Sequence, residues 1–132
     1  MRQTIALISG FFGLLFFEGF ARLIITFYHR IEFQFYGISH LPSDVWVVVI
    51  LFSVITSTWL VTMLILTVIN KHLLFYAGVF TFIVLGWRAI EIGNSYGNEP
   101  FWYFFTVLLL HIIGIFLAYQ SFTRQHEINP VN

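Results

Sequence analysis

Four long apolar stretches, separated by short polar segments, make up most of this chain. Residues 45–69 contain no charged side chain, and within residues 100–123 the only acidic or basic side chain is His111. Residues 4–28 and 73–93 are apolar apart from two charged side chains each. A helix needs about 20 apolar residues to cross the hydrocarbon core of a bilayer. The pattern therefore predicts an all-α protein, an integral membrane four-helix bundle with transmembrane helices at about residues 4–28, 45–69, 73–93 and 100–122 and an outer loop at 29–44.

The amino-acid composition supports the same interpretation. Of the 132 residues, 59% are hydrophobic and 9% are charged, whereas soluble proteins have about 25% charged residues. The predicted helices occupy most of the chain, so we expect a single transmembrane domain over residues 1–132 and no soluble catalytic domain. We expect the first stretch to be a retained helix, because it is longer than a signal peptide, carries Glu18 and Arg22, and lacks a small-x-small cleavage site.

The distribution of Lys and Arg predicts the orientation in the membrane. Cytoplasmic loops carry an excess of these residues. With both termini inside, the cytoplasmic side holds Arg2, Lys71 and Arg124, and the outer loop holds Arg30. We therefore expect an up-down-up-down bundle with N-in and C-in topology, in the bacterial inner (cytoplasmic) membrane. The connection at residues 70–72 is so short that the second and third helices should be antiparallel neighbours.

Aromatic and small residues predict further features of the bundle. Tryptophan and tyrosine gather toward the proposed outer boundary, as in an interfacial aromatic belt; the residues are Trp46, Trp87, Trp102, Tyr28, Tyr36, Tyr96 and Tyr103. Small residues four apart, which allow close helix approach, occur at Ser9 and Gly13 and at Gly114 and Ala118. In the outer loop, Ile31, Phe33 and Phe35 alternate with polar or aromatic neighbours. This alternation is compatible with an extended segment laid over the bundle or the headgroups, but the pattern is short and favours an irregular loop with aromatic interfacial anchors.

Two oppositely charged pairs lie within the predicted spans, where ionisable groups are costly and usually mark a functional site or a mutually satisfied network. Glu18 and Arg22 are four residues apart, and Arg88 and Glu91 are three apart, so each pair shares a helix face. Counted from Thr4 and Leu73, Glu18 and Arg88 both lie roughly 21–22 Å along their helices. Arg22 and Glu91 both lie roughly 27 Å along.

The equal depths predict a crosswise arrangement. If the two charged faces meet, Glu18 opposes Arg88 in a deeper layer and Arg22 opposes Glu91 nearer the outer surface. Such a layer is neutral, and two interpretations of it remain open. It is a structural network in which all four groups satisfy one another, or it is an outward-facing polar pocket in which Arg22 or Arg88 binds an anionic ligand.

His111 lies near the middle of the fourth predicted helix. A histidine at this depth either hydrogen-bonds a hydroxyl on a neighbouring helix or serves as a proton relay or ligand. The second helix offers hydroxyl partners at middle depth, namely Ser53, Thr56, Ser57 and Thr58. Bis-histidine haem is not expected, because His29, His40, His72 and His126 lie at the span ends. His29, Glu32 and His40 have irregular spacing for a surface metal, and the chain has no cysteine, so we expect no metal and no cofactor.

No catalytic motif is present: the sequence lacks HExxH, GxSxG and a glycine-rich phosphate loop. The leading hypothesis is a non-enzymatic accessory or small-ligand-binding subunit, with Glu18, Arg22, Arg88, Glu91 and His111 as its ligand-binding or structural network. The expected partners are the lipid bilayer, a homo-oligomer or a larger membrane complex, and a lipid, quinone or small anion as ligand; no nucleic acid is expected. The alternatives are a small ion or proton-coupled transporter or channel, a membrane-embedded lipid or quinone enzyme, and an immunity protein.

Overall fold

The described part of the chain consists of four α-helices. The computed structural model describes residues 1–31, 38, 41, 43–97 and 99–128, without the side chains of residues 95 and 125–128. The helices are α1 (Arg2–His29), α2 (Asp44–Ile69), α3 (Leu73–Ser95) and α4 (Phe101–Ile128), and all four are long and apolar enough to cross a membrane. This confirms the all-helical class and the four candidate spans. The alternating pattern at residues 31–36, with both of its interpretations, falls mostly on residues 32–37, which lie outside the described residues.

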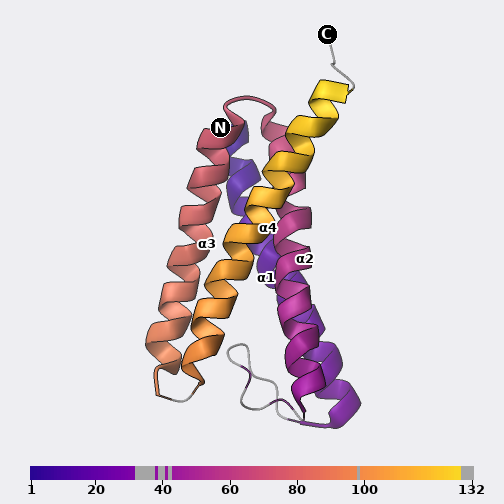
Figure 1. Cartoon of the computed structure of the whole chain (residues 1–132), viewed down its shortest axis with the longest axis vertical. Helices are drawn as coiled ribbons and strands as arrows, with labels where there is room; N and C mark the ends of the chain where they lie inside the picture. The colour runs from indigo at the N-terminus through magenta and orange to yellow at the C-terminus, as the bar shows by residue number, and fades with distance from the viewer. Residues whose placement is uncertain (32–37, 39–40, 42, 98, 129–132) are drawn as a thin grey trace.

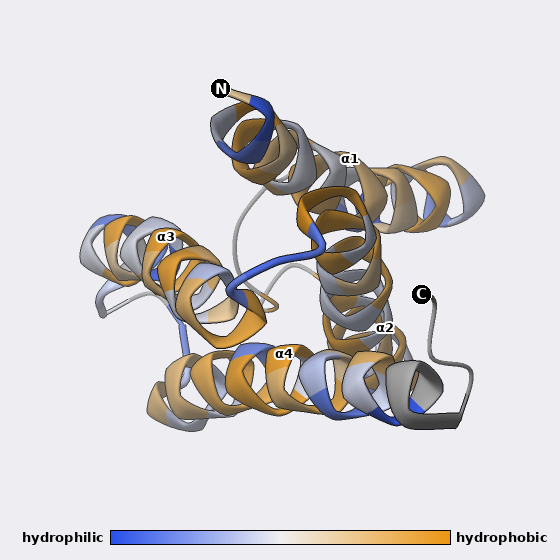
Figure 2. Cartoon of the chain, turned by 90° about the horizontal axis from the view of Figure 1, so that it is seen from above, coloured by the Kyte–Doolittle hydropathy of each residue, from blue (hydrophilic) through white to orange (hydrophobic). Residues whose placement is uncertain are grey.

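The helices run along one long axis, each opposite in direction to the one before it (Figure 1). The N-terminus, the α2–α3 connection and the end of α4 lie at one end of the molecule. Viewed along the axis, the order around the bundle is α1, α2, α4, α3 (Figure 2). Helices α1 and α3, which carry the charged pairs, therefore run in the same direction.

The four helices do not pack equally closely on their neighbours. Helix α2 has extensive contacts with both α1 and α4, whereas α3 packs mainly on α4. Helices α2 and α3 are neighbours, as their short connection predicts, but they touch over a small area, and so do α1 and α3. The charged groups that join α1 to α3 thus lie where the backbones have few other contacts.

Small residues allow the close approaches on either side of α2. Gly114 lies against the Thr58 side chain, and a Cβ added there would come 3.2 Å from Thr58 Cβ. On α1 the tightest point is Gly10, where an added Cβ would lie 2.3 Å from Ile65 Cδ1. At Gly13 the corresponding distance, to Val61 Cγ2, is an ordinary 3.8 Å. Close packing was therefore predicted correctly, although on α1 Gly10 makes the closest contact.

The interior contains two apolar clusters. One joins all four helices and includes Leu14, Leu66, Phe80 and Ile115. The other lies toward the opposite end and includes Val54, Tyr103, Phe104, Val107 and, from the connection before α2, Ile38. The Ile38 N–H donates to Glu99 Oε2 at 3.0 Å, which fastens this connection to the residues just before α4.

Large apolar side chains also cover the outside of every helix. Phe16 on α1 is 68% exposed and Phe82 on α3 is 83% exposed. Water would strongly disfavour apolar surface on this scale, whereas the hydrocarbon interior of a membrane accepts it. The interior, in contrast, holds a cluster of charged side chains.

Candidate functional site

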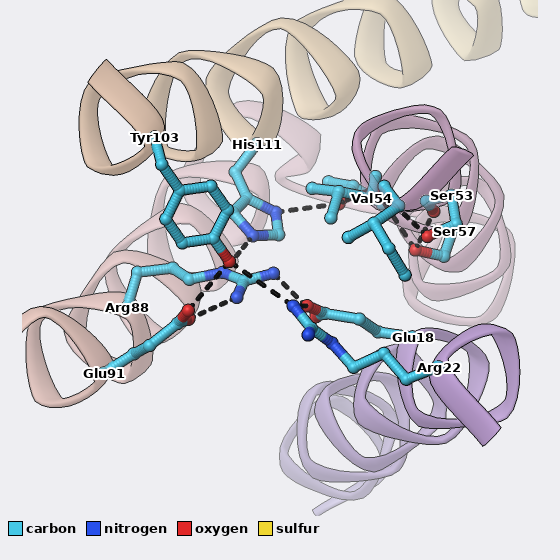
Figure 3. Close-up of polar contacts among 11 residues, drawn as sticks. Glu18, Arg22, Ser53, Val54, Ser57, Arg88, Glu91, Tyr103 and His111 are labelled. Atoms are coloured by element: carbon cyan, nitrogen blue, oxygen red, sulfur yellow. Dashed lines mark hydrogen bonds and ion pairs between the residues drawn. The ribbon is translucent and has the colours of Figure 1, made fainter. Parts of the chain in front are cut away.

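The four charged side chains predicted to meet lie together in the centre of the bundle (Figure 3). Glu18 and Arg22 come from α1, Arg88 and Glu91 come from α3, and each is at most 3% exposed. Their helix positions place them between the two apolar clusters. We call these four residues, with Tyr103, His111 and Thr58, the charged layer.

Arg88 is the centre of the charged layer. Its Nη2 lies 2.6 Å from Glu18 Oε2, which confirms the predicted ion pair between α1 and α3. Its Nη1 pairs with Glu91 Oε2, one turn along the same helix. Its Nε donates to His111 Nε2 at 2.8 Å. One guanidinium therefore links α1, α3 and α4, which its planar set of donors makes possible.

Tyr103 lies between the other two charged groups. Arg22 Nη2 is 3.3 Å from Glu18 Oε1 on its own helix and 3.4 Å from the Tyr103 hydroxyl. That hydroxyl donates to Glu91 Oε1 at 2.8 Å. Arg22 and Glu91 are thus joined through α4. The assignment of Tyr103 to an interfacial belt was wrong, because its side chain is turned inward and only 1% exposed.

His111 continues the layer from α3 and α4 to α2. Its Nδ1 lies 2.8 Å from Thr58 Oγ1, and that hydroxyl donates to the Val54 carbonyl oxygen at 2.6 Å. Because Arg88 Nε always carries its proton, His111 Nε2 must be the acceptor. The proton of the neutral ring then lies on Nδ1 and is donated to Thr58; this tautomer is assigned from the hydrogen-bond directions.

Ser53, Ser57, Thr62 and Thr67 donate their hydroxyls to carbonyl oxygens of α2 itself. Ser57 Oγ donates to the Ser53 carbonyl oxygen at 2.6 Å, and Thr62 Oγ1 donates to the Thr58 carbonyl oxygen at 2.6 Å. Such bonds to the preceding turn are common for Ser and Thr in membrane helices. Of the four hydroxyls proposed as partners for His111, Thr58 makes the contact.

The charged layer is enclosed. The crevice beside it is lined by Arg88, Glu91, Ile92, Tyr103, Phe104 and Val107, and it is too narrow to hold a water molecule. Two carboxylates and two guanidiniums make the layer neutral when His111 is uncharged. Each arginine already pairs with a carboxylate, Arg22 with Glu18 and Arg88 with Glu18 and Glu91.

All five site residues predicted from the sequence therefore belong to one group. One member, Tyr103, was not among the predicted site residues, and Thr58 was one of four candidate partners for His111. Tyr103 resembled a boundary tyrosine, and the choice of Thr58 among four hydroxyls depends on helix rotation. One signal was available: Tyr103, Val107 and His111 follow each other at four-residue spacing, which places them along one row of α4.

The described residues hold no group of three acidic, histidine or cysteine side chains that could bind a metal ion. Glu32 and His40, which were considered with His29, lie outside this part of the chain. Comparisons of the chain with protein-family models, curated proteins and solved structures give no match.

Proposed function

We propose that this protein is a non-enzymatic accessory subunit of a membrane assembly, in which the charged layer acts as a structural clamp. The observation that carries the proposal is that all three guanidinium nitrogens of Arg88 are engaged, by Glu18, Glu91 and His111, beside a crevice without room for water. Single buried charges are very costly in a membrane interior. A closed and neutral group of charges removes that cost and fixes how the helices are arranged.

The geometry gives less support to proton-coupled transport. A relay histidine must exchange protons at a ring nitrogen with a group that can itself gain or lose one. Here His111 Nε2 faces the permanently protonated Arg88 Nε. His111 Nδ1 faces the Thr58 hydroxyl, whose own proton is already donated to the Val54 carbonyl oxygen. If His111 were protonated on both ring nitrogens, its Nε2–H and the Arg88 Nε–H would face each other, and neither would have an acceptor. Catalysis is disfavoured for a related reason, since Glu18 and Glu91 are both engaged by cations or donors.

A role in assembly is supported by the outer surface. Most of the described residues lie in the four candidate spans, so we expect a partner to bind within or along the membrane. Helix α1 presents a row of exposed phenylalanines at four-residue spacing, Phe12, Phe16 and Phe20. Aromatic side chains supply a large contact area with few rotatable bonds. The clamp would keep such a surface in one fixed shape for a partner helix.

The proposed orientation has N-in and C-in topology, in a bacterial cytoplasmic membrane. The end of the molecule that bears the N-terminus (Figure 1) also holds Lys71 and Arg124. The opposite end holds Arg30 together with the acidic Asp44 and Glu99. This asymmetry agrees with the preference of cytoplasmic segments for Lys and Arg.

The test is purification of the tagged chain from its native membrane in a mild detergent. We expect a stoichiometric partner that remains through size-exclusion chromatography and disappears when the membrane is dissolved in a harsh detergent. A matched comparison of Phe16→Ala on α1 with Phe82→Ala on α3 then identifies the face used. A chain that isolates alone under all mild conditions would contradict the accessory role and leave the clamp to be judged by stability measurements.

A further inference from the structure

An apolar groove runs along the outside of the bundle between α1 and α2, away from the charged layer. Its volume is about 200 Å³. It is lined on α1 by Ala6, Ser9, Gly10, Gly13 and Phe17 and on α2 by Val61, Leu64, Ile65 and Val68. Ser9, Leu64 and Val68 are exposed, so the groove opens outward to the surroundings of the bundle.

The length of the groove corresponds to one leaflet of a bilayer. From Ala6 to Phe17 the helix rises about 17 Å, and half of the hydrocarbon core is about 15 Å. A helix about 10 Å in diameter is too wide for the groove volume, whereas a single acyl chain has a suitable shape. The small side chains of Ser9, Gly10 and Gly13 leave this space open.

The end of the groove nearest the N-terminus is positively charged. Arg2 lies four residues before Ala6, on the same face of α1, and its Nη2 is 3.4 Å from the carbonyl oxygen of Ile69, next to Val68. Lys71 follows two residues later and is exposed. Figure 2, viewed from this end, shows hydrophilic colour at the start of α1 and on the α2–α3 connection. The groove therefore leads directly to a cluster of cations.

Helix α1 adds to this positive charge. Its first turn contains no acidic residue, so nothing on the helix offsets the positive end of the helix dipole. The N–H groups of a first helical turn also favour an anion. The cations, the helix end and the apolar groove together suit a ligand with a negative head and an apolar tail.

We infer that the α1–α2 groove binds one anionic phospholipid of the inner leaflet, with an acyl chain along the groove and the headgroup phosphate at Arg2 and Lys71. Basic clusters at the cytoplasmic ends of transmembrane helices recognise such lipids. The inference rests on the membrane insertion proposed above, and it is independent of the accessory role.

The charge test uses the full chain in vesicles of equal parts phosphatidylglycerol and phosphatidylcholine, followed by native mass spectrometry of the retained lipids. We expect the wild-type chain to retain phosphatidylglycerol preferentially. Arg2→Gln and Lys71→Gln should each reduce that preference about fivefold. Arg2→Lys should keep most of it. Arg124→Gln is the matched control, because Arg124 lies at the same end on α4, away from the groove.

The groove test compares two glycines beside grooves of similar size. Gly13→Leu fills the α1–α2 groove, whereas Gly78→Leu fills a groove of about 190 Å³ between α3 and α4. We expect Gly13→Leu to abolish the retained phosphatidylglycerol and Gly78→Leu to preserve it.

Three results would overturn the lipid site: equal retention of the two lipids by the wild-type chain, an equal effect of Arg124→Gln and Arg2→Gln, or full retention by Gly13→Leu. A chain that fails to enter the vesicles would instead overturn the proposed membrane insertion.

Discussion

Arg88 determines how the charged layer is built, because one side chain must satisfy partners on three helices. Its Nη2, Nη1 and Nε point to Glu18, Glu91 and His111, respectively. A lysine ammonium at this position would be a single point charge on a flexible stem and could not hold these three directions at once. The requirement for an arginine here is therefore geometric as well as electrostatic.

The same geometry predicts the protonation state of His111. Solution or solid-state ¹⁵N NMR of the reconstituted chain at neutral pH should show a neutral ring with the proton on Nδ1. Thr58→Val removes the acceptor of that proton and should cost about 1–3 kcal/mol in unfolding free energy. Thr58→Ser keeps the hydroxyl and is the matched control. A ring protonated on Nε2 would show that the Arg88–His111 hydrogen bond is wrong.

At the scale of single residues, the sequence predicted that Glu18 and Arg88 meet. It did not predict that the Tyr103 hydroxyl lies between Arg22 and Glu91, which were expected to oppose each other directly. The equal depths of Glu18 and Arg88 follow from counting helix residues. The inward direction of Tyr103 depends on the rotation of α4 about its axis, which residue spacing alone leaves open. Tyrosines at span ends usually lie in the interface, so this one was misassigned.

At the scale of helices, close approach governs how α1 meets α2. The Gly10 Cα lies against Ile65, so a methyl group at that position has no room unless a side chain or a helix moves. Overpacking of this kind typically costs about 1–3 kcal/mol. The charged layer tolerates little movement of α1, because Glu18 lies two turns farther along the same helix.

Gly10→Ala should therefore destabilise the protein by about 1–3 kcal/mol, measured by reversible unfolding in mixed micelles. Gly13→Ala and Gly78→Ala are the controls, because an added Cβ makes an ordinary contact at Gly13 and meets nothing within 4 Å at Gly78. Combining Gly10→Ala with Ile65→Val should recover part of the loss by removing the Cδ1 atom. Equal stability of all three alanine variants would show that α1 and α2 are not this close.

Helix boundaries were predictable wherever the helix ends near the edge of its apolar run. Helices α1, α2 and α3 begin and end within two residues of the expected positions. Helix α4 continues to Ile128, six residues past the expected end. The apolar pattern marks where a helix would leave lipid, whereas residues such as Arg124 and Gln125 have good helix propensity and extend the helix beyond that point.

At the scale of the whole molecule, the direction of insertion follows from charge at the two ends. The chain contains no cysteine, so a single introduced thiol can be labelled without background. In intact cells a membrane-impermeant maleimide should label Ser43→Cys, at the start of α2, and should label Gln3→Cys only after lysis. The reverse labelling pattern would invert the proposed topology and place the cationic groove end outside.

The charged layer also joins helices that otherwise have little contact. Helices α1 and α3 touch over a small area, and the Glu18–Arg88 ion pair spans them at 2.6 Å. If the layer is a clamp, its members must contribute to global stability as a unit. Loss of one partner leaves an uncompensated charge, which typically costs about 3–5 kcal/mol when buried.

The most direct test of the clamp is a double-mutant cycle of Glu18→Gln and Arg88→Met, followed by reversible unfolding in mixed micelles. We expect the double variant to lose less stability than the sum of the single variants, with a coupling energy of about 1–3 kcal/mol. In the control cycle of Phe16→Leu and Phe82→Leu, two exposed positions on the same helices, the changes in unfolding free energy should be additive. Additive losses for Glu18 and Arg88 as well, within about 0.5 kcal/mol, would contradict the clamp.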